Sequence, residues 1–121
     1  MPKVLVVDDE RYIRLLYSEE LNEAGYDVIT AEGCYKLLEK IEEEKPDLIV
    51  LDIEMVDCNG LDILQEIRSH FYDLPIVLAT AFDSYKEDMK SIAADFFVPK
   101  SYDLSELKRK VAMALEKRLG S

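Results

Sequence analysis

The stretch VLVVDDE at residues 4–10 decides the fold that this sequence predicts, because an apolar run there ends abruptly in acidic residues. The stretch LIVLD at residues 48–52 repeats the pattern and ends on Asp52. An apolar run of this length is typical of a strand that is buried on both faces, and a carboxylate where the run stops marks the edge of the sheet. If the two strands are neighbours, the side chains of Asp8, Asp9 and Asp52 converge on one small space.

Three carboxylates in one space have a direct electrostatic consequence. Like charges at short range repel and raise one another's pKa, unless a cation lies among them. Hard divalent cations prefer oxygen ligands of this kind. The pattern therefore predicts a Mg²⁺ site at the edge of the sheet.

Strand and helix patterns alternate along the chain, and this alternation predicts an α/β fold whose parallel sheet is covered by helices on both faces. The predicted strands are 3–8, 27–31, 47–52, 75–80 and 95–99. The apolar faces of the predicted helices lie within 13–24, 37–41, 61–67, 85–93 and 104–115. Gly25 is expected to end the first helix, and capping boxes to open the last two at Ser84 and Asp103. Open sheets of this kind bind ligands beyond the carboxyl ends of their strands.

Composition limits the classes of function. The 121 residues suit one domain, predicted to span 1–121, and the formal charge of −11 argues against direct binding to nucleic acid or to an anionic membrane surface. No stretch reaches the length of a membrane span and no signal peptide is evident, so we expect a cytoplasmic protein. Cys34 and Cys58 lack the spacing of a zinc site or a disulfide framework, and we expect reduced structural thiols.

Each polar residue at a predicted strand end has a simpler explanation when it is taken alone. An aspartate there is often only the cap of the next helix. Thr80 fits a strand because it is β-branched, and Lys100 alone would be an ordinary surface lysine. Together, in the order in which the sheet would display them, these residues indicate a chemical site.

Five motifs resemble those of the response-regulator receiver domains of two-component signalling, in both order and spacing. The motifs are VLVVDDE, LIVLDIEM, NGLDIL, VLATA and FFVPK. The resemblance covers essentially the whole chain. It implies a flavodoxin-like, doubly wound (βα)5 fold with the strand order 2-1-3-4-5.

The resemblance assigns a role to each acidic residue of the site. Asp52 is expected to be the phosphoacceptor, which takes a phosphoryl group from a phosphohistidine. Asp9, Asp52 and the backbone carbonyl of Glu54 are expected to bind Mg²⁺ directly, with Mn²⁺ as a substitute ion, and Asp8 to act through a bound water. The cation matters because an anionic phosphoryl group approaches a carboxylate only after local negative charge is neutralised.

The same resemblance implies a switch. Lys100 is expected to pair with Asp52 at rest and with the phosphoryl oxygens afterwards. Thr80 would sense the phosphoryl group, and Phe97 would fill the space that the Thr80 side chain leaves. The helix from Ser84, the strand 95–99 and the helix from Asp103 would display the change to a partner. Glu54 and Phe82 are expected to modulate the lifetime of the phosphoryl group.

Partners follow from the resemblance as well. A sensor histidine kinase or a histidine phosphotransfer protein is expected to dock near Arg11, Arg14 and Leu15, and a downstream protein target to read the output face. A monomer and a phosphorylation-dependent dimer both fit, and a stand-alone regulator is favoured over a receiver taken from a longer protein. The chain would catalyse its own phosphorylation and dephosphorylation without being a multi-turnover enzyme.

Two alternatives stay open at this point. An aspartyl-phosphate hydrolase of the haloacid-dehalogenase type also has a nucleophile at a strand end with an acid two residues later, as Asp52 and Glu54 are arranged. However, that family places its second acidic cluster after the nucleophile, and 121 residues leave no room for a cap. A degenerate receiver that only binds protein would be favoured if a key residue were missing, and none is.

Overall fold

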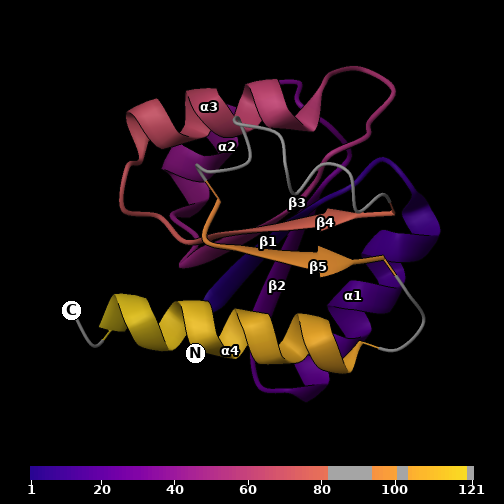
Figure 1. Ribbon diagram of the computed structural model, residues 1–121, viewed down its shortest axis with the longest axis vertical. Helices are drawn as coiled ribbons and strands as arrows, with labels where there is room; N and C mark the ends of the chain where they lie inside the picture. Colours follow the sequence, from indigo (N-terminus) through magenta and orange to yellow (C-terminus); the bar gives the residue numbers. More distant parts are fainter. Residues whose placement is uncertain (82–93, 101–103, 120–121) are drawn as a thin grey trace.

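Five parallel strands form the central sheet of the computed structural model (Figure 1). Their order is β2-β1-β3-β4-β5, as the resemblance implied. Every strand bound lies within one residue of the predicted one, because buried apolar runs define strands well. The strands are β1 (Lys3–Val7), β2 (Asp27–Ala31), β3 (Leu48–Asp52), β4 (Ile76–Thr80) and β5 (Phe96–Pro99). The structure describes residues 1–81, 94–100 and 104–119.

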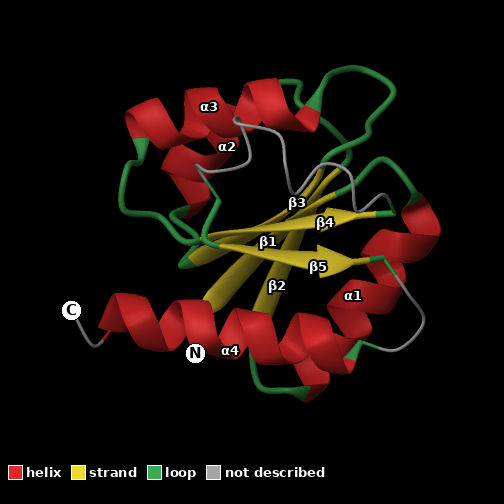
Figure 2. Cartoon of the chain, in the orientation of Figure 1, coloured by secondary structure: helices red, strands yellow, loops and turns green. Residues whose placement is uncertain are grey.

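Helices cover both faces of this sheet and complete a three-layer arrangement (Figures 1 and 2). The helices α2 and α3 lie on one face, and α1 and α4 lie on the other. Their bounds are α1 (Arg11–Glu23), α2 (Leu37–Glu44), α3 (Gly60–His70) and α4 (Ser105–Leu119). The helix predicted from Ser84 lies outside the described residues, as do Phe82 and Asp103. The helix labelled α4 therefore corresponds to the fifth helix that the sequence predicts, the one expected from Asp103.

Alternate residues of the strands divide the core into two halves. In β1, Val4 and Val6 face α1 and α4, whereas Leu5 and Val7 face α2 and α3. Successive side chains of a strand point to opposite faces of a sheet, and a parallel sheet is buried on both. This double burial fixes the register of the central strands, because a slip of one residue would exchange the two faces. The carboxyl ends of the strands are therefore held in fixed positions relative to one another.

The ends of two helices require the left-handed backbone. Gly25 follows α1 with φ 100°, and its amide donates to the carbonyl of Asn22 at 3.0 Å. The expectation that Ala24 belongs to the buried face of this helix was wrong: α1 ends at Glu23 and Ala24 is exposed. The helix α2 ends at Glu44, and the next residue, Lys45, caps it with φ 49° although it carries a side chain.

The structure contradicts the expectation of two reduced thiols. Cys34 and Cys58 are joined by a disulfide, with their Cα atoms 6.2 Å apart. Their separation of 24 residues gave no sign of a pair. The sheet order supplies the physical reason, because β2 and β3 flank β1 and the loops that leave their carboxyl ends meet above it.

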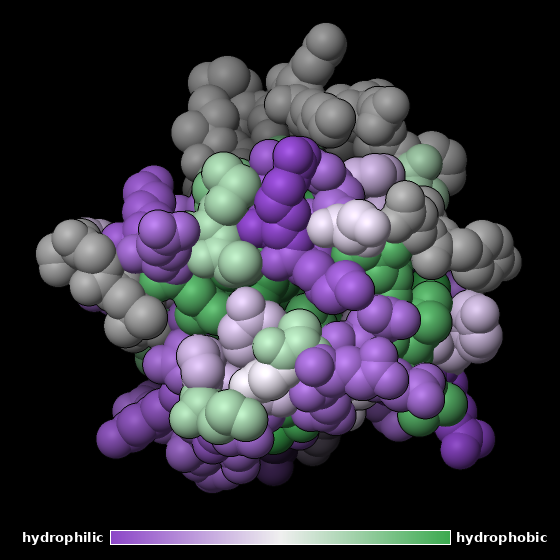
Figure 3. Space-filling view, turned by 90° about the horizontal axis from the view of Figure 1, so that it is seen from below, coloured by the Kyte–Doolittle hydropathy of each residue, from purple (hydrophilic) through white to green (hydrophobic). Residues whose placement is uncertain are grey.

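One face of the molecule is largely hydrophilic. The face that is seen from below carries many hydrophilic residues, with smaller hydrophobic areas between them (Figure 3). Within residues 1–81, 94–100 and 104–119, no helix combines the length and the apolar content needed to cross a bilayer.

Candidate functional site

Polar side chains gather where the parallel strands end. Asp8 directly follows β1, Asp52 closes β3, and Thr80 closes β4. All three are buried, at 1%, 2% and 3% exposure, although the core around them is apolar. Lys100 follows β5, and its amide donates to the carbonyl of Thr80 at 2.9 Å. The carboxyl edge of the sheet therefore holds these residues at one end of the molecule.

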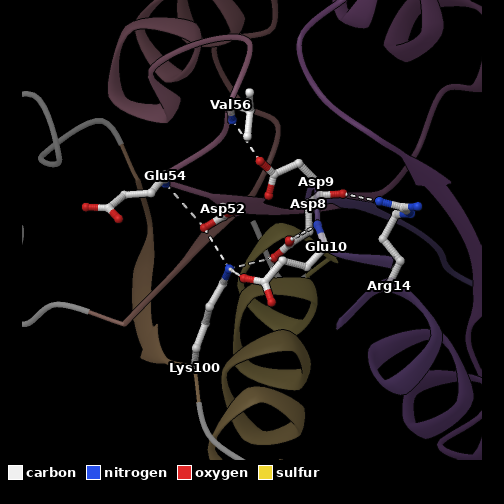
Figure 4. Close-up of polar contacts among 8 residues, drawn as sticks. All are labelled: Asp8, Asp9, Glu10, Arg14, Asp52, Glu54, Val56 and Lys100. Atoms are coloured by element: carbon white, nitrogen blue, oxygen red, sulfur yellow. Dashed lines mark hydrogen bonds and ion pairs between the residues drawn. The ribbon is translucent and has the colours of Figure 1, made fainter. Parts of the chain in front are cut away.

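The ammonium group of Lys100 lies between the acidic side chains (Figure 4). Its Nζ atom is 2.9 Å from Oδ2 of Asp8 and 3.0 Å from Oδ1 of Asp52. A third carboxylate, that of Glu10, lies 3.6 Å away and is largely exposed. One cation therefore serves several anions, and the negative charge is not fully offset.

The pKa values show the same imbalance. The pKa of Asp52 is raised to about 7, mainly by burial and also by the negative charge of Asp8, while Lys100 opposes both effects. Burial also raises the pKa of Asp8, against the hydrogen bond from the amide of Glu10 and the charge of Lys100. Burial alone would lower the pKa of Lys100, but its hydrogen bond to Asp8 and the charge of Asp52 outweigh burial and raise it. An additional cation would relieve this excess of negative charge.

Asp9 turns towards the loop between β3 and α3. The amide of Val56 in that loop donates to Oδ2 of Asp9 at 2.7 Å. The amide of Glu54 donates more weakly to Oδ1 of Asp52, at 3.3 Å. The other oxygen, Oδ2 of Asp52, is buried and has no hydrogen-bond partner among the described residues. Burying a carboxylate oxygen without a hydrogen-bond partner destabilises the folded state, and a ligand that binds this oxygen would relieve the destabilisation.

The start of α3 fixes the loop behind Asp52. The side chain of Asn59 caps the helix by accepting from the amide of Leu61 at 2.8 Å. The amide of Gly60 donates to the carbonyl of Ile53 at 2.7 Å. A Cβ atom at position 60 would lie only 2.3 Å from the carbonyl oxygen of Asp52, so this position needs glycine. The NGLDIL motif is thus the local device that brings the helix against the backbone of the phosphoacceptor candidate.

The residues present fit a magnesium ion. One oxygen atom each from Asp8, Asp9 and Glu10 lies within 4.8 Å of the others. The unpartnered oxygen of Asp52 adds a further carboxylate donor at the same edge. Clustered oxygen donors of high negative charge are what a hard divalent cation requires.

The structure brings some of the expected site residues into direct contact and places others nearby. Asp8 and Asp52 both contact Lys100, while Asp9 and Glu54 are linked to the site through the loop after β3. Thr80 is joined to the amide of Lys100 through its carbonyl. Phe97 is partly buried and packs on the core half that faces α2 and α3, and Phe82 lies outside the described residues.

Three contributors were not expected from the sequence. The carboxylate of Glu10 lies near the ammonium group of Lys100. The acidic run DDE at residues 8–10 was the one signal in the sequence that could have pointed to Glu10. The guanidinium of Arg14 donates to the backbone carbonyl of Asp8 at 2.7 Å and pairs with Glu32 at 3.5 Å. The hydroxyl of Tyr17 is buried without a partner among the described residues, and burial raises its pKa to about 12. No sequence pattern marks the roles of Arg14 and Tyr17, because both depend on how α1 packs.

This fold and this edge of charged residues are those of a phosphorylation-dependent signalling switch. The chain belongs to the response regulator receiver domain family, whose model matches residues 4–112. Receiver domains act in signalling rather than as ordinary enzymes, and the match gives no support to the haloacid-dehalogenase alternative.

Individual relatives agree with this assignment. The chain is 36% identical over 117 residues to the alkaline phosphatase synthesis transcriptional regulatory protein PhoP of Bacillus subtilis, covering 95% of this chain and 49% of PhoP. It is 38% identical over 107 residues to the response regulator MprA of Mycobacterium ulcerans, covering 87% of this chain and 46% of MprA. The chain thus spans about half the length of these curated relatives.

Two solved structures of one response regulator match over nearly its full length. The response regulator TrrA from Thermotoga maritima, in complex with Mg²⁺–BeF, has a TM-score of 0.90 and 46% identity, covering 94% of this chain and 99% of TrrA. TrrA in complex with the histidine kinase ThkA has a TM-score of 0.88 and 47% identity, covering 95% of this chain and 99% of TrrA.

Proposed function

We propose that Asp52 is the phosphoacceptor of a two-component system or phosphorelay. The observation that carries this proposal is the buried Asp52 carboxylate, which has Lys100 at 3.0 Å from one oxygen and, among the described residues, no hydrogen-bond partner at the other. That second oxygen attacks the phosphorus of a phosphohistidine, the new O–P bond forms, and the P–N bond breaks. The histidine leaves with the electron pair, and the product is an acyl phosphate on Asp52.

Magnesium is the proposed cofactor, with Mn²⁺ as a substitute. Asp9, Asp52 and the backbone carbonyl of Glu54 would hold the ion directly, and Asp8 through a water. When bound, the ion neutralises the charge that otherwise keeps an anionic phosphoryl group away. The Mg²⁺–BeF complex of TrrA supports this assignment.

We propose that Lys100 and Thr80 detect the phosphoryl group on Asp52. The ammonium group of Lys100 exchanges its contact with Asp52 for a contact with the phosphoryl oxygens, because both are anionic. The Thr80 hydroxyl donates to a phosphoryl oxygen, and Phe97 moves into the space that Thr80 leaves. The surface of β5, α4 and the segment 84–93 then changes its affinity for a downstream protein target. Glu54 and Phe82 set the phosphoryl lifetime.

The proposed phosphodonor is a sensor histidine kinase or a histidine phosphotransfer protein that docks on α1 near Arg11, Arg14 and Leu15. Leu15 is 58% exposed beside the acidic edge, and the complex of TrrA with ThkA supports a kinase partner. We also propose one receiver domain over 1–121, a cytoplasmic location, no direct nucleic-acid contact and no multi-turnover activity. Stand-alone action and the choice between a monomer and a phosphorylation-dependent dimer stay predictions.

Intact-mass measurement after incubation with acetyl phosphate tests this function. We expect the chain to gain the mass of one phosphoryl group with Mg²⁺ present, and to gain none in excess chelator. Asp52→Asn keeps the size of the side chain and should abolish the gain. Asp73→Asn, at an exposed aspartate between α3 and β4, is the matched control and should still be labelled. Labelling of the Asp52→Asn variant at the rate of the native chain would place the acceptor elsewhere.

A further inference from the structure

The Cys34–Cys58 disulfide ties together two loops at the carboxyl edge. Cys34 lies between β2 and α2, and Cys58 lies between β3 and α3. The second loop begins immediately after Asp52 and carries Glu54 and Val56. A covalent link therefore ends on the same short loop that contacts the acidic site.

The two loops are also packed against each other beside the disulfide. The amide of Cys34 donates to Oδ2 of Asp57 at 3.0 Å. A Cβ atom on Gly33 would lie 2.6 Å from both carboxylate oxygens of Asp57, so the loops approach as closely as glycine allows. The link and these contacts together hold Asp57 and Cys58 in place.

The loop that carries Cys58 contacts the candidate metal site through the backbone amide of Val56. Val56 is the residue before Asp57, and its amide donates to Oδ2 of Asp9 at 2.7 Å. The amide of Glu54, in the same loop, donates to Asp52. Hydrogen bonds to a ligating carboxylate fix its orientation, and loss of such bonds typically weakens metal binding.

We propose that Cys34 and Cys58 form a redox modification site that sets the Mg²⁺ affinity of the acidic edge. In the oxidised form the disulfide holds the loop so that Val56 orients Asp9. In the reduced form the contacts of Asp57 still join the two loops but the covalent link is gone, so the loop samples other positions and the site binds Mg²⁺ less tightly. This inference rests on the proposed function.

The redox step needs a thiol reductant, either a small thiol or a protein dithiol. A reductant thiolate attacks one sulfur of the disulfide, the Sγ–Sγ bond breaks, and the released thiolate takes a proton. A second reductant thiolate then attacks the reductant's sulfur in the mixed disulfide, the bond to the remaining protein cysteine breaks, and that cysteine leaves as a thiolate and takes a proton. The cysteine pair gains two electrons and two protons, and two reductant thiols become one disulfide. Both cysteines are half-buried, so the sulfur atoms lie near the surface where a reductant can reach them.

Mg²⁺ titration calorimetry on three protein forms tests the inference. The forms are the oxidised chain, the chain reduced with a phosphine, and the double variant Cys34→Ser/Cys58→Ser, which is measured with and without the phosphine. Alkylation followed by intact-mass measurement establishes the thiol state of each sample. We expect the reduced chain to bind Mg²⁺ about tenfold more weakly than the oxidised chain. The double serine variant should match the reduced chain and should not respond to the phosphine.

Hydrogen exchange in metal-free protein gives an independent readout. We expect the amide of Val56 to exchange about tenfold faster in the reduced chain, whereas amides of the central strands stay unchanged. Equal Mg²⁺ affinity in both redox forms, or two alkylatable thiols after treatment with oxidant, overturns this inference and leaves the proposed function standing. If neither form binds Mg²⁺, the proposed function itself is wrong and this inference falls with it.

Discussion

The two edges of the sheet hold their charges in opposite ways. At the amino edge the charges are closely matched: Arg68 lies 3.2 Å from Asp95, and Lys3 lies 3.6 Å from Glu44. At the carboxyl edge the single ammonium group of Lys100 faces Asp8 and Asp52, both almost fully buried. Each of these two anions at the amino edge therefore has a cation beside it, whereas at the carboxyl edge two buried anions share one.

This difference separates structural from functional charge. The Arg68 guanidinium also donates to the carbonyls of Tyr72 and Leu74, at 2.8 and 2.7 Å, so its interactions link α3 to the loop that follows it. At the carboxyl edge, by contrast, one oxygen of Asp52 has no partner among the described residues. Buried charge that is left unbalanced lowers stability and has to be offset by a ligand. Each prediction below tests whether the two edges behave independently.

The largest expected effect is a loss of stability with rising pH in metal-free protein. The pKa of Asp52 is about 7 in the folded chain against 3.8 for the ordinary group, so between these values the folded chain holds a proton that the unfolded chain has released. The stabilising contribution is therefore full below about pH 4 and is lost as the pH rises through about 7. At about 1.4 kcal/mol per pKa unit, the free energy of unfolding should fall by on the order of 4 kcal/mol.

Urea unfolding from pH 4 to pH 8 in the presence of a chelator measures this effect. Asp52→Asn is the control, because its side chain does not titrate, and its stability should fall much less over the same range. Added Mg²⁺ should restore most of the stability of the native chain at pH 7 and above, since the ion binds the folded state. Stability that rises from pH 4 to pH 7 as steeply in the native chain as in the variant would contradict the imbalance at this edge.

A smaller loss is expected when the amino edge is broken. Arg68→Ala removes the ion pair with Asp95 and leaves the carbonyls of Tyr72 and Leu74 without their donor. We expect the free energy of unfolding to fall by about 2 kcal/mol, with Mg²⁺ affinity unchanged. Denaturant titration and calorimetry on the same sample measure the two quantities.

Lys117→Ala is the matched control for Arg68. Lys117 also approaches Asp95, at 3.9 Å, but its side chain is 73% exposed. Its removal should change stability by less than about 0.5 kcal/mol, because exposed ion pairs contribute little. A change in Mg²⁺ affinity of threefold or more in Arg68→Ala would show that the edges are coupled.

The sequence predicts the sheet of this molecule better than its loops. Each strand is an apolar run, and double burial leaves such a run few alternatives, so the strand bounds and the placement of Asp8 and Asp52 at strand ends follow from VLVVDDE and LIVLD. The strand order came from the resemblance, since apolar runs alone do not state which strands are neighbours.

Contacts between loops could not be predicted in the same way. The Cys34–Cys58 pair depends on two loops that meet only after β2 and β3 have taken their places beside β1. The contact of Arg14 with the carbonyl of Asp8 likewise depends on the packing of α1. Residues that are distant in sequence and irregular in backbone leave no periodic pattern, so the sequence shows which residues are present but not which of them touch.

The smallest expected effect is a gain of stability at the amino edge. Lys45 caps the end of α2 with φ 49°, a left-handed conformation that is unfavourable for a residue with a side chain. Its amide donates to the carbonyl of Ile41 at 2.9 Å. Lys45→Gly keeps this bond and removes the steric strain, so we expect the free energy of unfolding to rise by about 0.5–1 kcal/mol. Gly25→Ala, at φ 100°, is the reverse control and should lower stability by a similar amount. Because position 45 is exposed and lies at the opposite edge from Asp52, Mg²⁺ affinity should stay the same in both variants. A Lys45→Gly chain that is more stable yet binds Mg²⁺ differently would mean that stability and ion binding are linked through the sheet.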